Sequence, residues 1–182
     1  MSESIKDKIE DKIIDWAVRG AGDRLVIFKP EGTGNKADLV AEKKGEYEIK
    51  EDKALGQNHV VKTQIFGKSS KKRVKKLNIF IGGDIKIGAE KELTKKINIE
   101  ELKHFENCYL IFTFFNTVKQ DLSDYVCLVD LKKFEESANA TEDTGVKEFK
   151  SFLSPDKKDK FSDFLLNKKD LSQTLFNIIS AV

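Results

Sequence analysis

The feature that most constrains the fold is a pair of long apolar runs, NCYLIFTFFN at residues 107–116 and DYVCLVDL at residues 124–131. Strands that are apolar at nearly every position are typical of the centre of a sheet that is covered on both faces. Each run is far shorter than the roughly 20 residues that a membrane-spanning helix needs. We therefore expect the chain to fold around a central sheet, with helices on its faces.

Helices that would cover this sheet are predicted at both ends of the chain. Residues 4–19 place apolar side chains on one helical face, and the glycines at positions 20 and 22 end the pattern. The members of that face are Ile5, Ile9, Ile13, Trp16 and Ala17. Near the other end, Ser154, Pro155 and Asp156 form a typical helix start, and the apolar residues that follow predict one or two terminal helices.

Length and composition favour a single domain. A chain of 182 residues can bury one substantial core, and 39% hydrophobic with 35% charged residues is typical of a globular protein with a highly charged surface. We expect an α/β or α+β fold in which helices flank a mixed central sheet. Its core would span about residues 4–130, followed by a C-terminal helical extension at about residues 145–182.

Three shorter strands are predicted after the first helix. They are RLVIFKP at residues 24–30, ADLVAEK at residues 37–43 and EYEIKED at residues 46–52. Lys44 and Gly45 would join the last two as a tight hairpin. The hairpin would place Asp38 opposite the end of the third strand.

The region between these strands and the apolar runs is predicted in part. LNIFIGGDIKIG at residues 77–88 alternates like a second hairpin that turns at its two glycines. NIEELKHF at residues 98–105 predicts a short helix with Asn98 as its N-cap. The small polar segment SANATEDTG at residues 137–145 predicts a loop.

The first hairpin would bring charged residues of opposite sign together. Side chains alternate faces along a strand, so Glu48 and Lys50 share one face while Tyr47 and Ile49 take the other. Asp38 would lie near them. Two converging carboxylates repel, and a hard divalent cation such as Mg²⁺ relieves that repulsion. A cation with a neighbouring ammonium group is the minimal equipment for hydrolysing a phosphodiester.

The segment GTGNKADLVAEKKGEYEIK resembles the motif of the PD-(D/E)xK nuclease superfamily, which includes type II restriction endonucleases and archaeal Holliday junction resolvases. Asp38 would supply the aspartate of the motif, and Glu48-Ile49-Lys50 its E-x-K. The predicted order of elements is similar to the αβββαβ core of that family. The resemblance implies Mg²⁺, or Mn²⁺, held by Asp38 and Glu48, with Lys50 orienting the attacking water. It also implies an accessory carboxylate on the first helix, for which Glu10 is the candidate.

Two alternatives remain open at the motif. Glu51-Asp52-Lys53 is a second E-x-K directly after the first, and a slip of three residues would give the catalytic role to Glu51 and Lys53. We favour Glu48 and Lys50 because apolar residues alternate with them. The other alternative is a solvent-exposed hairpin without chemistry, since E-x-K arises often by chance in a chain this rich in lysine and glutamate.

A basic segment follows the motif. Seven basic residues and no acid lie between positions 62 and 76, namely Lys62, Lys68, Lys71, Lys72, Arg73, Lys75 and Lys76. A solvated loop is the plain interpretation. The functional one is a segment that binds nucleic-acid phosphates independently of sequence. The net charge of +2 does not by itself predict nucleic-acid binding.

The remaining residues exclude several classes of site. Cys108 and Cys127 lack the spacing of a zinc site and the density of a disulfide framework, and with His59 and His104 they form no recognised zinc pattern. We expect buried free thiols in a cytoplasmic protein. The resemblance to PD-(D/E)xK nucleases implies a metal-dependent DNA endonuclease, and because duplex cleavage in that family commonly uses a pair of active sites, a homodimer. The alternative is a non-catalytic nucleic-acid- or protein-binding module of the same fold.

Overall fold

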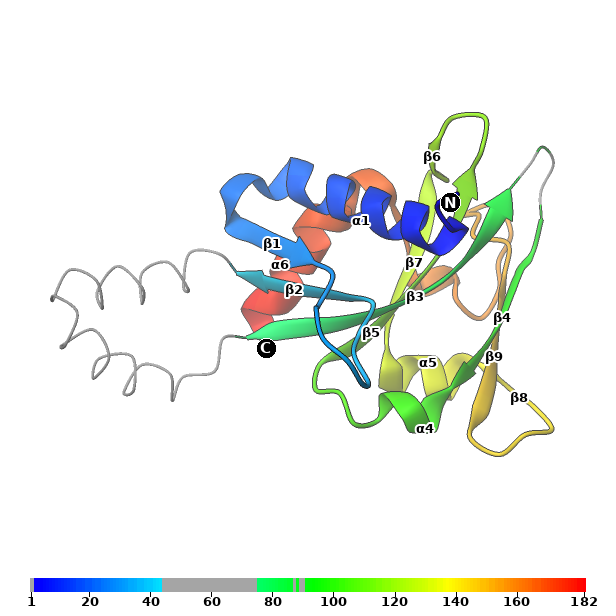
Figure 1. Ribbon diagram of the computed structural model, residues 1–182. Helices are drawn as coiled ribbons and strands as arrows, with labels where there is room; N and C mark the ends of the chain where they lie inside the picture. The colour runs from blue at the N-terminus through cyan, green and yellow to red at the C-terminus, as the bar shows by residue number, and fades with distance from the viewer. Residues whose placement is uncertain (1, 44–74, 87, 89–90) are drawn as a thin grey trace, which may run out of the picture.

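The computed structural model describes residues 2–43, 75–86, 88 and 91–182. Within this part of the chain, a seven-stranded sheet has the order β1-β2-β3-β5-β7-β10, with β6 paired to β5, and a three-stranded sheet has the order β4-β9-β8 (Figure 1). The strands of the larger sheet are β1 (Leu25–Phe28), β2 (Leu39–Lys43), β3 (Lys76–Lys86), β5 (Cys108–Asn116), β6 (Asp121–Leu122), β7 (Tyr125–Asp130) and β10 (Leu165–Asn167). Those of the smaller sheet are β4 (Leu93–Asn98), β8 (Asn139–Ala140) and β9 (Val146–Ser151).

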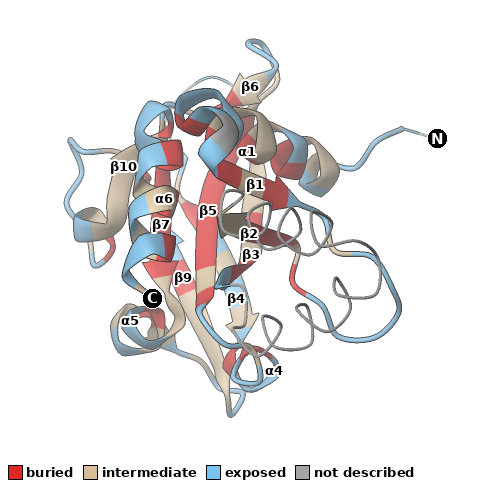
Figure 2. Cartoon of the chain, turned by 90° about the vertical axis from the view of Figure 1, so that its left-hand side faces the viewer, coloured by how far each residue is buried: buried red, intermediate tan, exposed pale blue. Residues whose placement is uncertain are grey.

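The larger sheet is mixed, because β3 and β5 pair in parallel while its other neighbouring strands pair antiparallel. The two apolar runs of the sequence form β5 and β7, which are buried along almost their whole length at the centre of this sheet (Figure 2). An α+β fold with a mixed central sheet flanked by helices is therefore confirmed.

Two helices cover one face of the central sheet. They are α1 (Ile5–Ala21), whose N-cap Ser4 forms a capping box with Asp7, and α6 (Leu171–Ala181). Their apolar faces and those of β1, β2, β3, β5 and β7 form one core cluster. The predicted first helix and a single terminal helix are thus confirmed. No helix in the described part of the chain is long and apolar enough to cross a membrane.

The small sheet and two short helices, α4 (Ile99–Leu102) and α5 (Leu131–Ser137), cover the opposite face (Figure 1). Phenylalanines fill this second core, where the rings of Phe112 and Phe149 stack with centroids 3.8 Å apart. The predicted N-cap of α4 is confirmed, since Asn98 accepts a hydrogen bond from the Glu100 N–H. Short 3₁₀ turns at Gly22–Arg24, Ser162–Phe164 and Lys168–Asp170 connect the elements.

The predicted hairpin at residues 77–88 is wrong, because β3 runs straight through Gly82 and Gly83. The two glycines therefore allow close packing of other elements against β3, and they do not form a turn. A Cβ atom on Gly83 would lie 2.4 Å from Cδ1 of Ile9 in α1, and one on Gly82 would lie 2.7 Å from the Phe112 ring. Contacts from both faces of the sheet therefore explain why no side chain is present here.

The pairing of β2 also corrects the first predicted hairpin. One edge of β2 pairs with β1 and the other with β3, which places Leu39 opposite Ile79. The partner strand expected at residues 46–52 lies outside the described residues. Along residues 40–42, both edges of β2 are already paired, one with β1 and the other with β3. Neither edge of this part of β2 is therefore open to the predicted hairpin partner.

The C-terminal part is less helical than expected. Residues 145–182 contain the strands β9 and β10 together with α6, so the predicted helical extension is wrong in part. Ser154, Pro155 and Asp156 start no helix, and the helix that follows begins at Leu171. The short strand β8 lies within the predicted loop at residues 137–145.

Candidate functional site

Glu10 and Asp38 form a pair of acidic side chains where α1 crosses the start of β2. Glu10 lies on α1 beside the apolar residue Ile9, and it is only 6% exposed. Burial raises the pKa of Glu10, Lys29 acts against that rise, and the carboxylate of Asp38 adds to it. The fold therefore brings these two acids within electrostatic range of each other, although they are far apart in sequence.

Asp38 is held in place by the edge of β3. Because β3 continues past the start of β2, the N–H of Ile81 has no strand partner on that side, and Asp38 Oδ2 accepts its hydrogen bond at 2.8 Å. The other oxygen, Oδ1, lies 2.6 Å from Nζ of Lys6 on α1. Asp38 thus links the helix to the sheet.

Lys29 pairs with Glu10 from the end of β1. Its Nζ lies 3.3 Å from Glu10 Oε2 and 2.9 Å from Oδ1 of Asp11. The hydrogen bond to Asp11 raises the pKa of Lys29, and Glu10 contributes to the same rise. Each member of the carboxylate pair therefore has an ammonium partner.

This arrangement offers a divalent cation two carboxylates, the ligand type that Mg²⁺ prefers. The cation would compete with Lys6 and Lys29, whose side chains are 54% and 41% exposed and can swing into solvent. Within the described ranges, no group of three or more His, Cys, Asp or Glu side chains is placed to hold a metal. Glu10 and Asp38 could therefore supply two carboxylate ligands at most, and a magnesium site would need further ligands.

The structure brings together only two of the predicted site residues, Glu10 and Asp38. The other four of the motif, Glu48, Lys50, Glu51 and Lys53, lie outside the described residues. Of the basic segment, Lys75 precedes β3 and Lys76 begins it, and both are exposed. The remaining basic residues, Lys62, Lys68, Lys71, Lys72 and Arg73, also lie outside the described ranges.

β3 carries its own acidic residue and lysine at the spacing of the motif, Asp84-Ile85-Lys86. Asp84 is four residues, or about 13 Å, along the strand from the position opposite Asp38. Its carboxylate pairs with Lys91 at 2.9 Å, and this hydrogen bond lowers the pKa of Asp84. This second acidic motif was not predicted as a site, and its position along β3 separates it from Asp38.

The lysine partners were also missed at the level of sequence. The position of Lys6 could have been predicted from the sequence. Residues four apart on a helix share a face, and Lys6 precedes Glu10 by four residues, so both would face the same side of α1. No comparable signal existed for Lys29, whose contact with Glu10 depends on how β1 lies beside α1.

A second charged cluster is structural. Lys168 is 7% exposed, and its Nζ donates to Asp121 Oδ2 at 3.1 Å and to the Leu122 carbonyl at 2.9 Å. Trp16 Nε1 donates to the other Asp121 oxygen at 2.8 Å. Burial alone would raise the pKa of Asp121, but these hydrogen bonds outweigh it and lower the pKa. The cluster fastens α1 to the far end of the sheet with its polar groups satisfied.

Both cysteines are buried free thiols, as predicted. Burial raises the pKa of Cys108 to about 12 and that of Cys127 further, so neither thiol is activated. His104 is exposed in the turn after α4, and His59 lies outside the described residues.

Comparison with known proteins identifies no relative. No protein-family description matches the sequence, and neither curated proteins nor solved structures gave a match. The functional argument therefore depends on the motif in the sequence and on the geometry of Glu10 and Asp38.

Proposed function

We propose that this protein is a divalent-metal-dependent nuclease that hydrolyses phosphodiester bonds in DNA. Asp38 and Glu10 would be carboxylate ligands of Mg²⁺ or Mn²⁺. On the sequence motif alone, Glu48 would complete the ligand set and Lys50 would orient the attacking water. When bound, the metal would supply an activated water and polarise a phosphate oxygen.

The observation that carries the proposal is the approach of Glu10 to Asp38. The resemblance to PD-(D/E)xK nucleases implied an acid on the first helix near the motif aspartate, and Glu10 lies close enough to Asp38 for the Asp38 charge to raise its pKa. A buried acid with a raised pKa next to a second carboxylate is costly for stability, and such arrangements cluster at functional sites.

Two further parts of the proposal concern assembly and location. Cutting both strands of a duplex would use a homodimer, and we propose that the protein acts in the cytoplasm.

One observation favours a second candidate, a binding module without catalysis. Lys6 and Lys29 already provide a positive charge for each of the two carboxylates, so the pair does not require a cation. In that case the cluster would hold α1 against β2 and β3, and basic residues such as Lys75 and Lys76 would bind nucleic acid without cutting it.

A plasmid-nicking assay with Mg²⁺ separates the two candidates. The test variants are Asp38→Asn, which keeps an oxygen for the Ile81 N–H, and Glu10→Gln, which keeps the side-chain volume. Asp11→Asn is the matched control, because Asp11 neighbours Glu10 and contacts the same lysine but is 55% exposed. Lys50→Ala and Lys53→Ala decide which E-x-K acts.

For a nuclease we expect nicking by the parent and by Asp11→Asn, and a roughly 100-fold or greater loss in Asp38→Asn, since losing a metal ligand removes several kcal/mol of transition-state stabilisation. Loss in Lys53→Ala with activity retained in Lys50→Ala would assign the role to Glu51 and Lys53. A parent that binds DNA and cuts no form of it would establish the binding module.

A further inference from the structure

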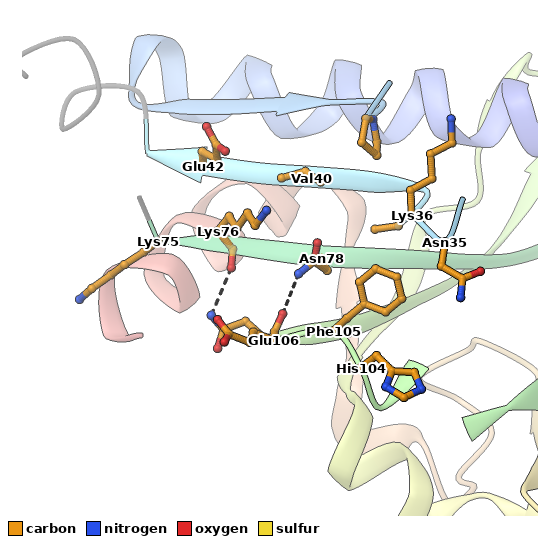
Figure 3. A pocket seen from close by; sticks show the side chains of 13 residues that line it. Asn35, Lys36, Val40, Glu42, Lys75, Lys76, Asn78, His104, Phe105 and Glu106 are labelled. Atoms are coloured by element: carbon orange, nitrogen blue, oxygen red, sulfur yellow. Dashed lines mark hydrogen bonds between the residues drawn. The ribbon is translucent and has the colours of Figure 1, made fainter. Parts of the chain in front are cut away.

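A cavity of about 780 Å³ opens on the face of β2 and β3 that is turned away from α1. Ala37 and Val40 line it from the loop before β2 and from β2 itself, and both are buried. Phe105 and the turn at His104–Asn107 line the side toward β5 (Figure 3). Asp38 follows Ala37 directly, so the cavity adjoins the start of β2, where Asp38 lies.

Asn78 presents a hydrogen-bond acceptor to this cavity. Its side chain is 7% exposed, and its amide nitrogen donates to the Glu106 carbonyl at 2.7 Å. That bond fixes the orientation of the Asn78 amide. The Glu106 carbonyl can only accept a hydrogen bond, so the amide nitrogen, and not the amide oxygen, must face it. The side-chain oxygen then points toward β2 (Figure 3), and no residue of the described ranges donates to it. Because this oxygen is open to the cavity, a ligand bound there can donate a hydrogen bond to it.

An aromatic ring and positive charge stand on either side of this acceptor. The ring of Phe105 lies beside Asn78 and is fixed by an edge contact with Phe80, whose centroid is 5.0 Å away. Lys76 extends along the sheet toward Asn78, whereas Lys75 points outward (Figure 3). The cavity thus combines an apolar floor, a planar stacking surface, a hydrogen-bond acceptor and an ammonium group, and the Glu42 carboxylate lines it across from Lys76.

These four features match one chemical class, a nucleotide. A base stacks on an aromatic ring and donates through its amino or imino N–H, while its phosphate attracts lysine. We propose that this cavity binds one nucleotide unit, with the base against Phe105, a base N–H on the Asn78 oxygen and the phosphate beside Lys76. This inference rests on the proposed nuclease function. It adds that the substrate is a nucleic acid with a single-stranded or unpaired nucleotide.

The test measures binding without catalysis, in EDTA. The probe is a fluorescein-labelled single-stranded DNA of about ten nucleotides, read by anisotropy, with unlabelled AMP as competitor. Phe105→Leu keeps an apolar side chain for packing and removes the stacking ring. Lys76→Gln removes the charge. Lys96→Gln is the matched control, because Lys96 is an exposed lysine of β4 that does not line the cavity.

We expect saturable binding that AMP displaces, weakened roughly tenfold by Phe105→Leu, since stacking of one base on an aromatic ring is worth that much or more. Lys76→Gln should weaken binding and reduce its salt dependence, while Lys96→Gln should match the parent. Direct AMP binding without oligonucleotide binding would identify a free nucleotide as the ligand. Binding that is insensitive to Phe105→Leu, or no binding of either probe, would overturn the proposal. Because no cutting is measured, a failure of the nuclease proposal would not produce these results.

Discussion

Replacing Gly83 with alanine should loosen the contact that places Glu10 against Asp38. The new Cβ would lie 2.4 Å from Cδ1 of Ile9 and 3.0 Å from the carbonyl oxygen of Thr113. Ordinary carbon contacts are about 3.5–4.0 Å, so Ile9 must retreat by about 1 Å or more. Ile9 is 1% exposed and belongs to the core cluster between α1 and the sheet. We expect α1 to shift with Ile9, and Glu10 is the next residue on that helix.

The cost can be worked out from this overlap. Inserting a methyl group into a packed core costs about 1–3 kcal/mol. With an m-value of about 2 kcal/mol per M for urea, the midpoint should fall by about 0.5–1.5 M. The chain has a single tryptophan, Trp16 on α1, so its fluorescence reports on the helix while far-UV circular dichroism reports on the whole fold.

Ile9→Val supplies the decisive control, because it removes the clashing Cδ1 and leaves Cγ1 at an ordinary 3.7 Å. Alone it should cost about 1 kcal/mol. The double variant should lose about 1 kcal/mol or more less stability than the sum of the two single losses, because Ile9→Val removes the atom with which the new Cβ clashes. Additive costs, or a Gly83→Ala variant as stable as the parent, would refute the reasoning.

Three further predictions concern charge and burial. Because the folded-state pKa of Glu10 is raised above its ordinary value of 4.5, the folded protein holds this proton longer than the unfolded chain does, so stability is lost as pH rises through the folded pKa. Glu10→Gln should therefore gain stability relative to the parent as pH increases from about 4, and urea midpoints that move in parallel would contradict this. Lys168→Met should destabilise the fold by about 1.5–3 kcal/mol, since charged hydrogen bonds to Asp121 and Leu122 are lost, and thermal unfolding that matches the parent would show the cluster to be dispensable. Cys108 and Cys127 should react with a thiol reagent at pH 8 only after denaturant is added, and rapid labelling of the native protein would show that the core opens.

The parts of the fold that were predictable are those set by local pattern. The face of α1 through Ile9 and Ile13 repeats at helical spacing, and β5 and β7 are apolar at almost every position because both of their faces are covered. β3 was not predictable in this way. Its glycines are typical of a turn, and the reason for them lies in Ile9 and Phe112, which belong to other segments.

In the candidate site, too, the positions set by local pattern were predictable and the contacts between distant segments were not. Glu10 is marked in the sequence by its place at the border of an apolar face, and Asp38 by its place before a strand. Their meeting depends on how α1 crosses the sheet, and the pairing of β2 with β3 depends on residues distant in sequence. Lys29 joins the pair only through the packing of β1 beside α1. No local pattern encodes such contacts.

The most direct test of the central claim is metal binding by Glu10 and Asp38. Tb³⁺ prefers oxygen ligands, and Trp16 can sensitise its emission, because it lies six residues, or about 9 Å of helix, beyond Glu10. We predict saturable emission that Mg²⁺ displaces, that Asp38→Asn and Glu10→Gln abolish, and that Asp11→Asn retains. Emission that is absent from the parent, or equal in all four proteins, would contradict the assignment of Glu10 and Asp38 as a metal site.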